Sequence, residues 1–412
     1  MFVQIHMLQS MPPGNLNRDD TGQPKKCLFG GVTRGRISSQ CLKYNIRHSS
    51  EFMEKYKNAL ADRTQYLPRM VAEALKQLDF TDEDLSKIKS ALGKKFKSEK
   101  SDSNDAKEDN NTKNTEDDAT DKTGQLVFFP SPFARSIANL IETLKREDKD
   151  AYESFINAAI KSKTDKDKRI KKRIDKFNEE VFRASETLTV DIALFGRMTT
   201  SDLVVNVEAA CQVAHAISTH ETLVESDYFT AMDDLKRKYA STQTEQMGAS
   251  FLGSGETETF FNAAVYYKYL NVDLDALEKH LSWGDKDSAE AVGALVHALP
   301  LVNPTGKQNS FAAHGVPELV LVEISQKKRP ISYANAFLQP VEGPNLMAES
   351  AKALGSYINS VATAFAPDDM QRFVLAVGSA ASIKIDKATS SKKLDDLVNC
   401  VIYALEKAEE TP

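Results

Sequence analysis

The sequence FVQIHML at residues 2–8 alternates apolar and polar side chains, with Val3, Ile5 and Met7 on one side and Gln4 and His6 on the other. A period of two predicts a β-strand with its apolar side against a core. Clean alternation is also typical of antiparallel sheets. We therefore predict that the chain is built on an antiparallel sheet.

Later stretches predict the rest of this architecture. Apolar runs at Phe260–Tyr269 and Leu319–Ile324 indicate two more strands. Apolar residues recur at helical spacing within Met70–Leu78, Ile137–Leu144 and Leu394–Leu405. The expected class is α+β, with a sheet backed by helices and a helical lobe inserted after the N-terminal strand and helix.

Composition narrows the class of protein. At 412 residues and 41% hydrophobic, the chain can bury a large core in more than one lobe. Its four cysteines form no Cys-x-x-Cys pair, which favours reduced thiols over a zinc ribbon or a disulfide framework. No signal peptide and no spanning helix of ~18 apolar residues is evident. We expect a soluble, cytoplasmic protein without metal or cofactor.

Positive charge is concentrated at the N-terminus. Residues 1–50 hold seven Lys and Arg against Asp19 and Asp20, a net charge of +5, whereas the whole chain carries −6. An acidic protein with one local basic region is suited to a specific groove for an anion rather than to indiscriminate coating of nucleic acid.

A helix at the end of this region suits a phosphate chain. Ser38 or Ser39 is placed to cap it, while Leu42 and Ile46 lie four residues apart on a buried stripe. Lys43 and Arg47 have the same spacing on another face, so free N–H groups and cations can meet one anion. The alternative is a solvated helix that follows structural glycines.

The order and spacing of these residues resemble the CasC family, the repeating backbone subunit of the type I-E CRISPR surveillance complex called Cascade. The blocks that carry the resemblance are NLNRDD (15–20), FGGVTRGRISSQCLK (29–43), VDIALFGRMTTS (190–201), AHAISTH (214–220) and YFTAMDDL (228–235), with weaker matches at GKQ (306–308) and ISYANAF (331–337). Residues 50–165 and the C-terminal part match poorly.

The resemblance implies a fold of three parts. These are an RRM-like (ferredoxin-like) antiparallel palm sheet, an inserted helical fingers lobe and a thumb extension. The palm with its thumb would take residues 1–50 and 185–412, with the thumb at about 195–260. The fingers would take residues 51–184. Residues 93–125 are rich in Lys, Asp, Asn, Ser and Thr with Phe96 as the only aromatic, which predicts a flexible loop there.

The resemblance also implies a function without catalysis. Copies of the subunit would assemble head to tail as a helical filament along one crRNA, leaving its bases free to pair with target DNA in an R-loop. Other implied partners are the large, small, cap and crRNA-processing subunits of Cascade, with no membrane. The residues that would hold the RNA backbone are Arg18, Lys25, Ser38, Gln40, Lys43 and Arg47, supported by Arg34 and Arg36, with Lys307 joining them by position.

A second basic segment covers residues 161–176. Ile170, Ile174, Phe177 and Val181 form a helical stripe, so this segment is expected to be a helix with one buried side. By resemblance, Arg169, Arg173 and Lys176 would contact the guide RNA. Ile170 replaces a lysine of the family, so Lys168 or Lys172 is an alternative ligand. A solvated basic face is the other alternative.

Three further residues are candidate wedges between bases. In the family, a methionine after Gly-Arg and an aromatic-Phe pair line the thumb beside the kinked guide, and these positions are Met198, Tyr228 and Phe229 here. Aromatic and thioether contacts can offset lost base stacking. Without the resemblance, all three would be assigned to the core.

Evidence for an enzyme is weak. His215 and His220 are five residues apart, which does not place them on one helical face as adjacent metal ligands. Asp19 and Asp20 support the alternative function, a metal-dependent RNA-cleaving subunit similar to those of type III complexes. We expect instead that these acids brace Arg18 or a neighbouring subunit.

Overall fold

The computed structural model describes residues 1–57, 59–78, 80–96, 122–157, 165–228, 234–235, 258–282 and 285–407. Its contacts divide the chain into two compact units. The sheet unit comprises Met1–Phe52, Gln212–Asp275 and Gly284–Pro412, and the helical unit comprises Met53–Cys211 and Ala276–Trp283. The chain therefore leaves the sheet unit early, builds the helical unit and then returns.

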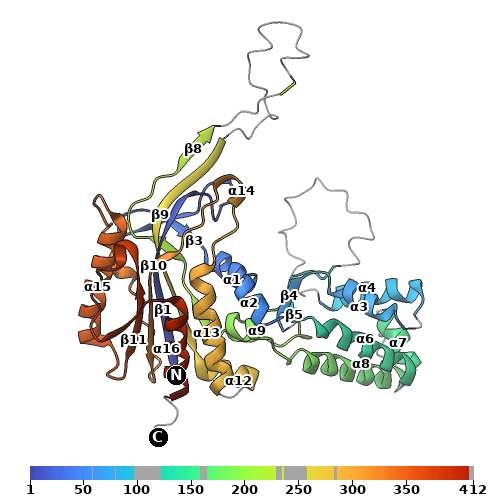
Figure 1. The fold of residues 1–412 in the computed structure, drawn as a ribbon. Helices are drawn as coiled ribbons and strands as arrows, with labels where there is room; N and C mark the ends of the chain where they lie inside the picture. Colours follow the sequence, from blue (N-terminus) through green and yellow to red (C-terminus); the bar gives the residue numbers. More distant parts are fainter. Residues whose placement is uncertain are drawn as a thin grey trace. The chain divides into compact units, whose positions relative to one another are not determined.

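The sheet unit holds most of the strands (Figure 1). Its elements are β1 (Phe2–Gly14), β2 (Lys26–Phe29), β3 (Val32–Ile37), α1 (Ser39–Arg47), β7 (Ala216–Ser218), β8 (Glu225–Tyr228), β9 (Glu258–Asp273), α13 (Asp285–Leu301), α14 (Gln308–Phe311), β10 (Pro317–Ser325), η1 (Ala334–Phe337), α15 (Leu346–Phe365), β11 (Gln371–Ala376), η2 (Gly378–Ala380), β12 (Ala388–Ser391) and α16 (Leu394–Lys407). Three elements at the borders of the units are α2 (Ser50–Lys55), β6 (Cys211–Val213) and α12 (Leu274–Leu281).

Ten of the described strands form one sheet with β1 at its centre. The strand order is β12-β11-β10-β1-β9-β7-β3-β2, and β6 and β8 also pair with β9. Along this path the neighbours are antiparallel except for β11 and β12. The predicted antiparallel sheet is confirmed, and the strands expected at Phe260–Tyr269 and Leu319–Ile324 lie within β9 and β10.

Helices cover both faces of the sheet, so both sides of β1 are buried. Met7 lies with Leu42 of α1 and Leu299 of α13 on one face. On the other face, Leu8 shares an apolar cluster with Leu354 of α15. The polar side of β1 is therefore covered rather than solvated, and its Gln4 and His6 are 1% and 0% exposed.

A hydrogen-bonded network joins buried polar groups under α15. The His6 Nδ1 lies 2.9 Å from the Tyr267 hydroxyl, and the Glu323 carboxylate accepts bonds from Arg372 Nε (2.7 Å) and Tyr333 Oη (2.9 Å). Burial raises the pKa of Glu323, but bonds and charge from His6 and Arg372 outweigh it and lower the pKa below its usual value. The carboxylate therefore stays ionised in the core.

Lys268 of β9 is buried on the opposite face, between the sheet and α1. Its side chain lies with Met7, Leu42 and Ile46, is 3% exposed and donates to Gln9 Oε1. Burial lowers the pKa of Lys268 to about 8. Within the described residues, no carboxylate forms an ion pair with this amine.

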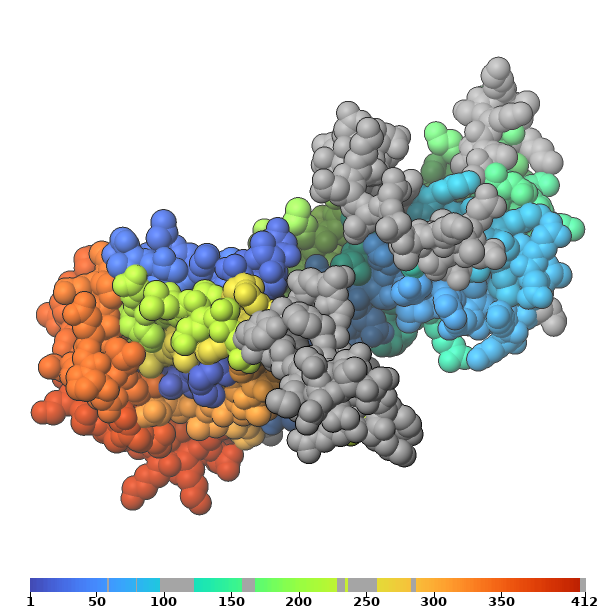
Figure 2. All heavy atoms as spheres, turned by 90° about the horizontal axis from the view of Figure 1, so that it is seen from above, coloured from blue at the N-terminus to red at the C-terminus, as the bar shows by residue number. Residues whose placement is uncertain are grey.

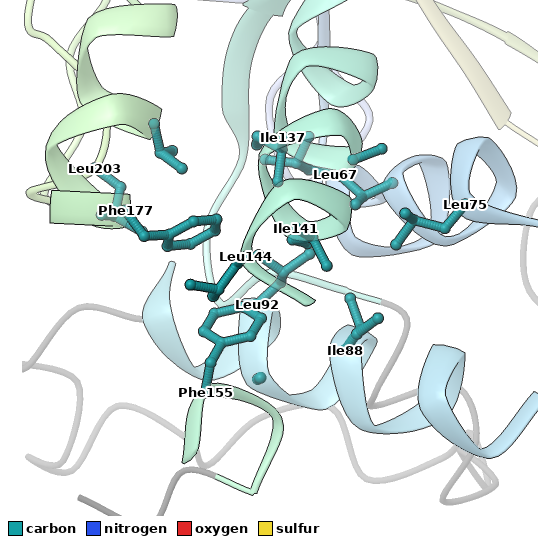
Figure 3. Close-up of a cluster of buried hydrophobic side chains, with 14 of the residues drawn as sticks. Leu67, Leu75, Ile88, Leu92, Ile137, Ile141, Leu144, Phe155, Phe177 and Leu203 are labelled. Carbon is teal, nitrogen blue, oxygen red and sulfur yellow. The ribbon is translucent and has the colours of Figure 1, made fainter. Parts of the chain in front are cut away.

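The helical unit is built around a large apolar core (Figure 3). Its elements are β4 (Ala61–Thr64), α3 (Leu67–Leu75), α4 (Asp82–Lys95), β5 (Val127–Pro130), α6 (Pro132–Glu147), α7 (Lys149–Ile156), α8 (Asp165–Ala184) and α9 (Val190–Phe195). In Figure 3, Leu92, Ile141 and Phe177 point toward one another from α4, α6 and α8. The predicted stripe of Ile170, Ile174, Phe177 and Val181 belongs to this core.

Two features of the predicted loop at 93–125 differ from expectation. Helix α4 continues to Lys95, and Phe96 after it is fully buried. The ring fills the core of the helical unit, which composition alone does not reveal. Residues 97–121 lie outside the described residues.

Residues 185–211 pack with the helical unit, whereas the sequence placed the return to the palm at 185. Arg197 anchors this segment. Its guanidinium is 3% exposed and donates to three carbonyl oxygens, those of Val205 (2.8 Å), Phe128 (3.2 Å) and Ser185 (2.7 Å). Burial lowers the pKa of Arg197 to about 10. Leu203 and Val204 complete the attachment by entering the apolar core.

Strands β8 and β9 leave the main sheet as a projecting hairpin (Figure 1). β9 is long enough to pair with β1 at one end and with β8 at the other. The part of the chain that the structure describes contains no helix with the length and apolarity needed to cross a membrane.

Candidate nucleic-acid interface

A loop at residues 15–25 is tied to the N-terminus of α1. The backbone N–H of Ser38 donates to the Asn17 side-chain oxygen (2.8 Å), and that of Lys25 donates to the Asn17 carbonyl (2.8 Å). Ser38 in turn accepts a bond from the Cys41 N–H (3.3 Å). Of the two predicted caps, Ser38 and Ser39, it is therefore Ser38 that caps α1. Ser38 is buried.

Cations gather on this loop and on β3. The Arg36 N–H donates to the Lys25 carbonyl (2.9 Å), and its guanidinium donates to Nδ1 of His215 (3.0 Å). Burial, and then the charges of Arg36 and Lys25, lower the pKa of His215. His215 therefore stays neutral beside these cations. In Figure 2 the N-terminal segments, in blue, reach the surface beside the yellow-green segment that leads into β8.

Lys307 reaches the same loop from a distant part of the chain. It is exposed and adopts a left-handed backbone with φ of 53°. The preceding Gly306 lies so close to the loop that an added Cβ would be 2.5 Å from the Leu16 carbonyl oxygen. Within the described residues, none of the cations Arg18, Lys25, Arg36 and Lys307 forms an ion pair.

Helix α1 carries the other predicted ligands. Gln40 is exposed, whereas Lys43 and Arg47 are half-buried. Leu42 and Ile46 are buried as the spacing predicted. The free N–H groups at the start of α1 and the cations of the loop are therefore held together by Asn17 and Ser38.

Arg34 has a place inside the fold instead of the predicted supporting contact with RNA. Its side chain is 0% exposed, and the guanidinium donates to the carbonyl oxygens of Phe29 (3.2 Å), Ser218 (3.1 Å) and Phe337 (2.7 Å). Burial lowers the pKa of Arg34. Because its donors already have backbone acceptors, Arg34 joins the β2–β3 hairpin to β7 and η1.

Asp19 shapes the loop rather than bracing Arg18. Its carboxylate accepts bonds from the Thr21 hydroxyl (2.7 Å), the Thr21 N–H (3.0 Å) and the Gln23 N–H (3.0 Å). These bonds, with the Thr21 hydroxyl the largest contributor, lower the pKa of Asp19. Asp20 is exposed. In the described ranges, no three acids, histidines or cysteines are grouped to hold a metal.

Met198 projects from the helical unit with 92% of its side chain exposed. Its neighbours on both sides are fixed, because Arg197 is buried and Thr199 donates its N–H to Asn206 Oδ1 (2.7 Å). The assignment to the core that composition alone suggested is wrong for this residue. Tyr228 ends β8, and Phe229 lies outside the described residues.

The family model for CT1975-like proteins matches residues 3–400. The chain belongs to this family. Two solved chains are similar to it over 98% of its length and 100% of theirs. One, a chain of a "CRISPR RNA-guided surveillance complex, pre-nicking", has 26% identity and a TM-score of 0.74. The other, of a "CRISPR RNA-guided surveillance complex", has 20% identity and a TM-score of 0.65.

These matches confirm that this chain resembles CasC-like Cascade subunits, as its sequence predicted. No curated protein sequence matches it. The structural match covers 98% of the chain and therefore includes parts of both units.

The predicted cations of α8 are already paired in the CT1975-like chain. Arg169 contacts Asp148 (3.4 Å) and Asp150 (3.3 Å), and Arg173 contacts Glu147 (3.2 Å). Glu180 lies 3.7 Å from Arg173 and 3.8 Å from Lys176. Lys171 and Lys172 are exposed and form no ion pair within the described part of α8 and its neighbours.

Asn17 and His215 position parts of the candidate site, and sequence reasoning assigned neither of them to it. Asn17 joins the basic loop to α1, and His215 supports Arg36. Each signal was weak, because an asparagine in a loop and a single histidine are common structural residues. Their partners lie 21 and 179 positions away in the CT1975-like chain, beyond the reach of any local pattern.

Proposed function

We propose that this chain is a non-catalytic, crRNA-binding backbone subunit of a type I-E-like Cascade complex. The observation that carries the proposal is the convergence of Arg18, Lys25, Arg36 and Lys307 on one loop beside the N-terminus of α1, without ion pairs among the described residues. Such a site favours an extended chain of phosphates, because it offers spaced cations together with helix N–H groups.

The palm of this proposal is an RRM-like sheet. A β-α-β-β-α-β order is found in β1, α1, β7, β9, α13 and β10, with other elements inserted between them. The four strands lie in the order β10-β1-β9-β7. This connectivity is that of the ferredoxin-like fold. The helical unit would be the fingers, and the β8–β9 hairpin would be the thumb.

Helix α15 affects how such a palm can hold RNA. An RRM stacks bases on the open face of its sheet, but here α15, Tyr333 and Phe337 cover that face. The RNA would then lie along α1 and the basic loop, where phosphates rather than bases are held. A grip of this kind leaves the guide bases free for pairing with target DNA.

Assembly follows from the size of the site. One basic loop and one helix hold only a short stretch of RNA, so a longer guide requires further copies packed head to tail in a helical filament. The guide then joins the copies through many weak contacts. The solved chains come from surveillance complexes guided by RNA, and we propose the other Cascade subunits and target DNA as further partners.

Purification through a tag on this chain tests the proposal. Expressed with its companion subunits and a CRISPR array, the protein should bring down a discrete small RNA, and lengthening the spacer should add mass in whole subunits. An intact complex without discrete RNA contradicts the proposal. Labelled RNA incubated with the complex and Mg²⁺ or Mn²⁺ should remain uncut, since Asp19 is engaged in its own loop.

A further inference from the structure

Helix α1 carries a row of exposed side chains next to its cationic row. Gln40, Tyr44 and His48 are spaced by four residues, so they lie one above the other on one face. All three are exposed. Ser39, Lys43 and Arg47 form the adjacent row with the same spacing, and the buried stripe of Leu42 and Ile46 attaches the helix to the sheet.

Two rings in the exposed row are stacked on each other. The centroids of Tyr44 and His48 are 4.2 Å apart with an angle of 27° between the ring planes. The Tyr44 side chain nevertheless remains 55% exposed. A large aromatic surface of this kind is open to a further stacking partner, because each ring buries only one face against the other.

The pair is also held in position. His48 caps the C-terminus of α1, and its backbone N–H donates to the carbonyls of Ile46 and Tyr44. Its ring Nδ1 lies 2.7 Å from the Tyr44 carbonyl oxygen. Since a carbonyl only accepts, Nδ1 carries the proton. The imidazole is thus fixed by its own helix, and a ligand would meet a surface that is ordered in advance.

We propose that Tyr44 and His48 form a stacking platform for an unpaired nucleobase of the bound RNA. Proteins that hold single-stranded nucleic acid combine a basic track for the backbone with aromatic rings for the bases. Helix α1 has both on adjacent rows. The inference rests on the proposed RNA-binding function, and it adds a base contact to a site that otherwise recognises phosphates.

A fluorescent reporter at position 44 tests the platform. Trp283 is the only tryptophan of the chain, so Tyr44→Trp in a Trp283→Phe background gives the full-length protein one reporter. Single-stranded oligouridine should quench it, whereas an abasic ribose-phosphate chain of equal length should not. Equal responses to both chains, or no response to saturating oligouridine, overturn the platform.

A matched control separates stacking from nonspecific approach of RNA. Tyr403 on α16 is 57% exposed, and the Lys407 amine lies 4.6 Å from its ring centroid. Tyr403→Trp in the same background is therefore an exposed aromatic beside a cation in another place. Its fluorescence should not change with oligouridine. Quenching there as strong as at position 44 contradicts a specific platform.

Affinity measurements give a second, independent result. Tyr44→Leu should weaken RNA binding about 5-fold, the lower end for one base–aromatic stack, with no change in salt dependence. Tyr44→Phe should bind like the parent. If labelled RNA binds none of the variants or the parent, the proposed function fails; if Tyr44→Leu binds like the parent, only the platform fails.

Discussion

The two units are alike in their buried arginines but differ in how their surface cations are paired. Arg34 in the sheet unit and Arg197 in the helical unit are both buried, and each donates to three carbonyl oxygens. On the surface, Arg18, Lys25 and Arg36 beside α1 form no ion pair within the described residues, whereas Arg169, Arg173 and Lys176 of α8 are paired with acids.

This difference shows that a basic segment becomes a candidate binding site only after the acids around it are known. The acids that pair with Arg169 and Arg173 belong largely to α6 and to the start of α7, about twenty residues earlier in the chain. A phosphate at α8 must first displace them. At the loop of residues 15–25, the described structure has no competing carboxylate that must leave.

The largest effect is expected from removing a buried arginine. Arg34→Met leaves three carbonyl oxygens without their donor, and each unsatisfied group costs roughly 1–3 kcal/mol. The free energy of unfolding should therefore fall by about 3 kcal/mol or more. Arg197→Met should lower it similarly, because the partner set is of the same kind. Denaturant unfolding measures both changes. If either variant is about as stable as the parent, the two arginines do not have the same role.

A pH dependence extends the comparison to another buried cation, Lys268. Its folded pKa of about 8 is below the unfolded value near 10.4, so the unfolded state binds more protons between these values. Stability attributable to Lys268 should then rise with pH from about 8 to 10.4, by on the order of 3 kcal/mol. Lys268→Met should remove this rise. Parallel curves for parent and variant would show that the amine is solvated.

An intermediate effect is expected at the basic loop. Arg18→Ala with Lys25→Ala and Lys307→Ala should reduce the slope of log affinity against log salt by roughly 2, because each phosphate contact of a single strand contributes ~0.7. Lys384, Lys387 and Lys392 around β12 are exposed and provide a control of equal charge. A control variant that changes the slope equally would show only a general charge effect.

The smallest effects are expected on α8. Arg173→Ala removes ion pairs with Glu147 and Glu180 from a side chain that is 16% exposed, and should cost about 1 kcal/mol of stability with little change in RNA affinity. Lys172→Ala should leave stability unchanged and weaken RNA binding slightly. The reverse result, with Arg173 dominating RNA binding, would restore the contact implied by the resemblance.

Met198→Ala tests an exposed apolar residue of the helical unit in place of a cation. Since the side chain is almost wholly exposed, its truncation should not destabilise the helical unit. If the residue separates bases of the guide, chemical probing of the bound RNA should show that the periodic kinks are lost. Leu203→Ala, a core residue of the same segment, is the control that should lower stability instead.

Patterns within a few residues were sufficient for much of the fold. The alternation at residues 2–8, the Ser38 cap and the stripe from Ile170 to Val181 depend on local geometry, because strand and helix periods are properties of the backbone. These elements occur where they were expected. The family could also be recognised, because its blocks keep their order along the chain.

Contacts between distant residues decided what the sequence left open. Phe96 is buried because helices from elsewhere close over it, and Arg34 is withdrawn from the surface by carbonyls up to 303 positions away. Whether a cation binds a ligand, a neighbouring acid or a carbonyl depends on which groups the fold brings within about 4 Å. The sequence by itself determined the elements and the family, and only the tertiary structure decided which of its cations are available to a ligand.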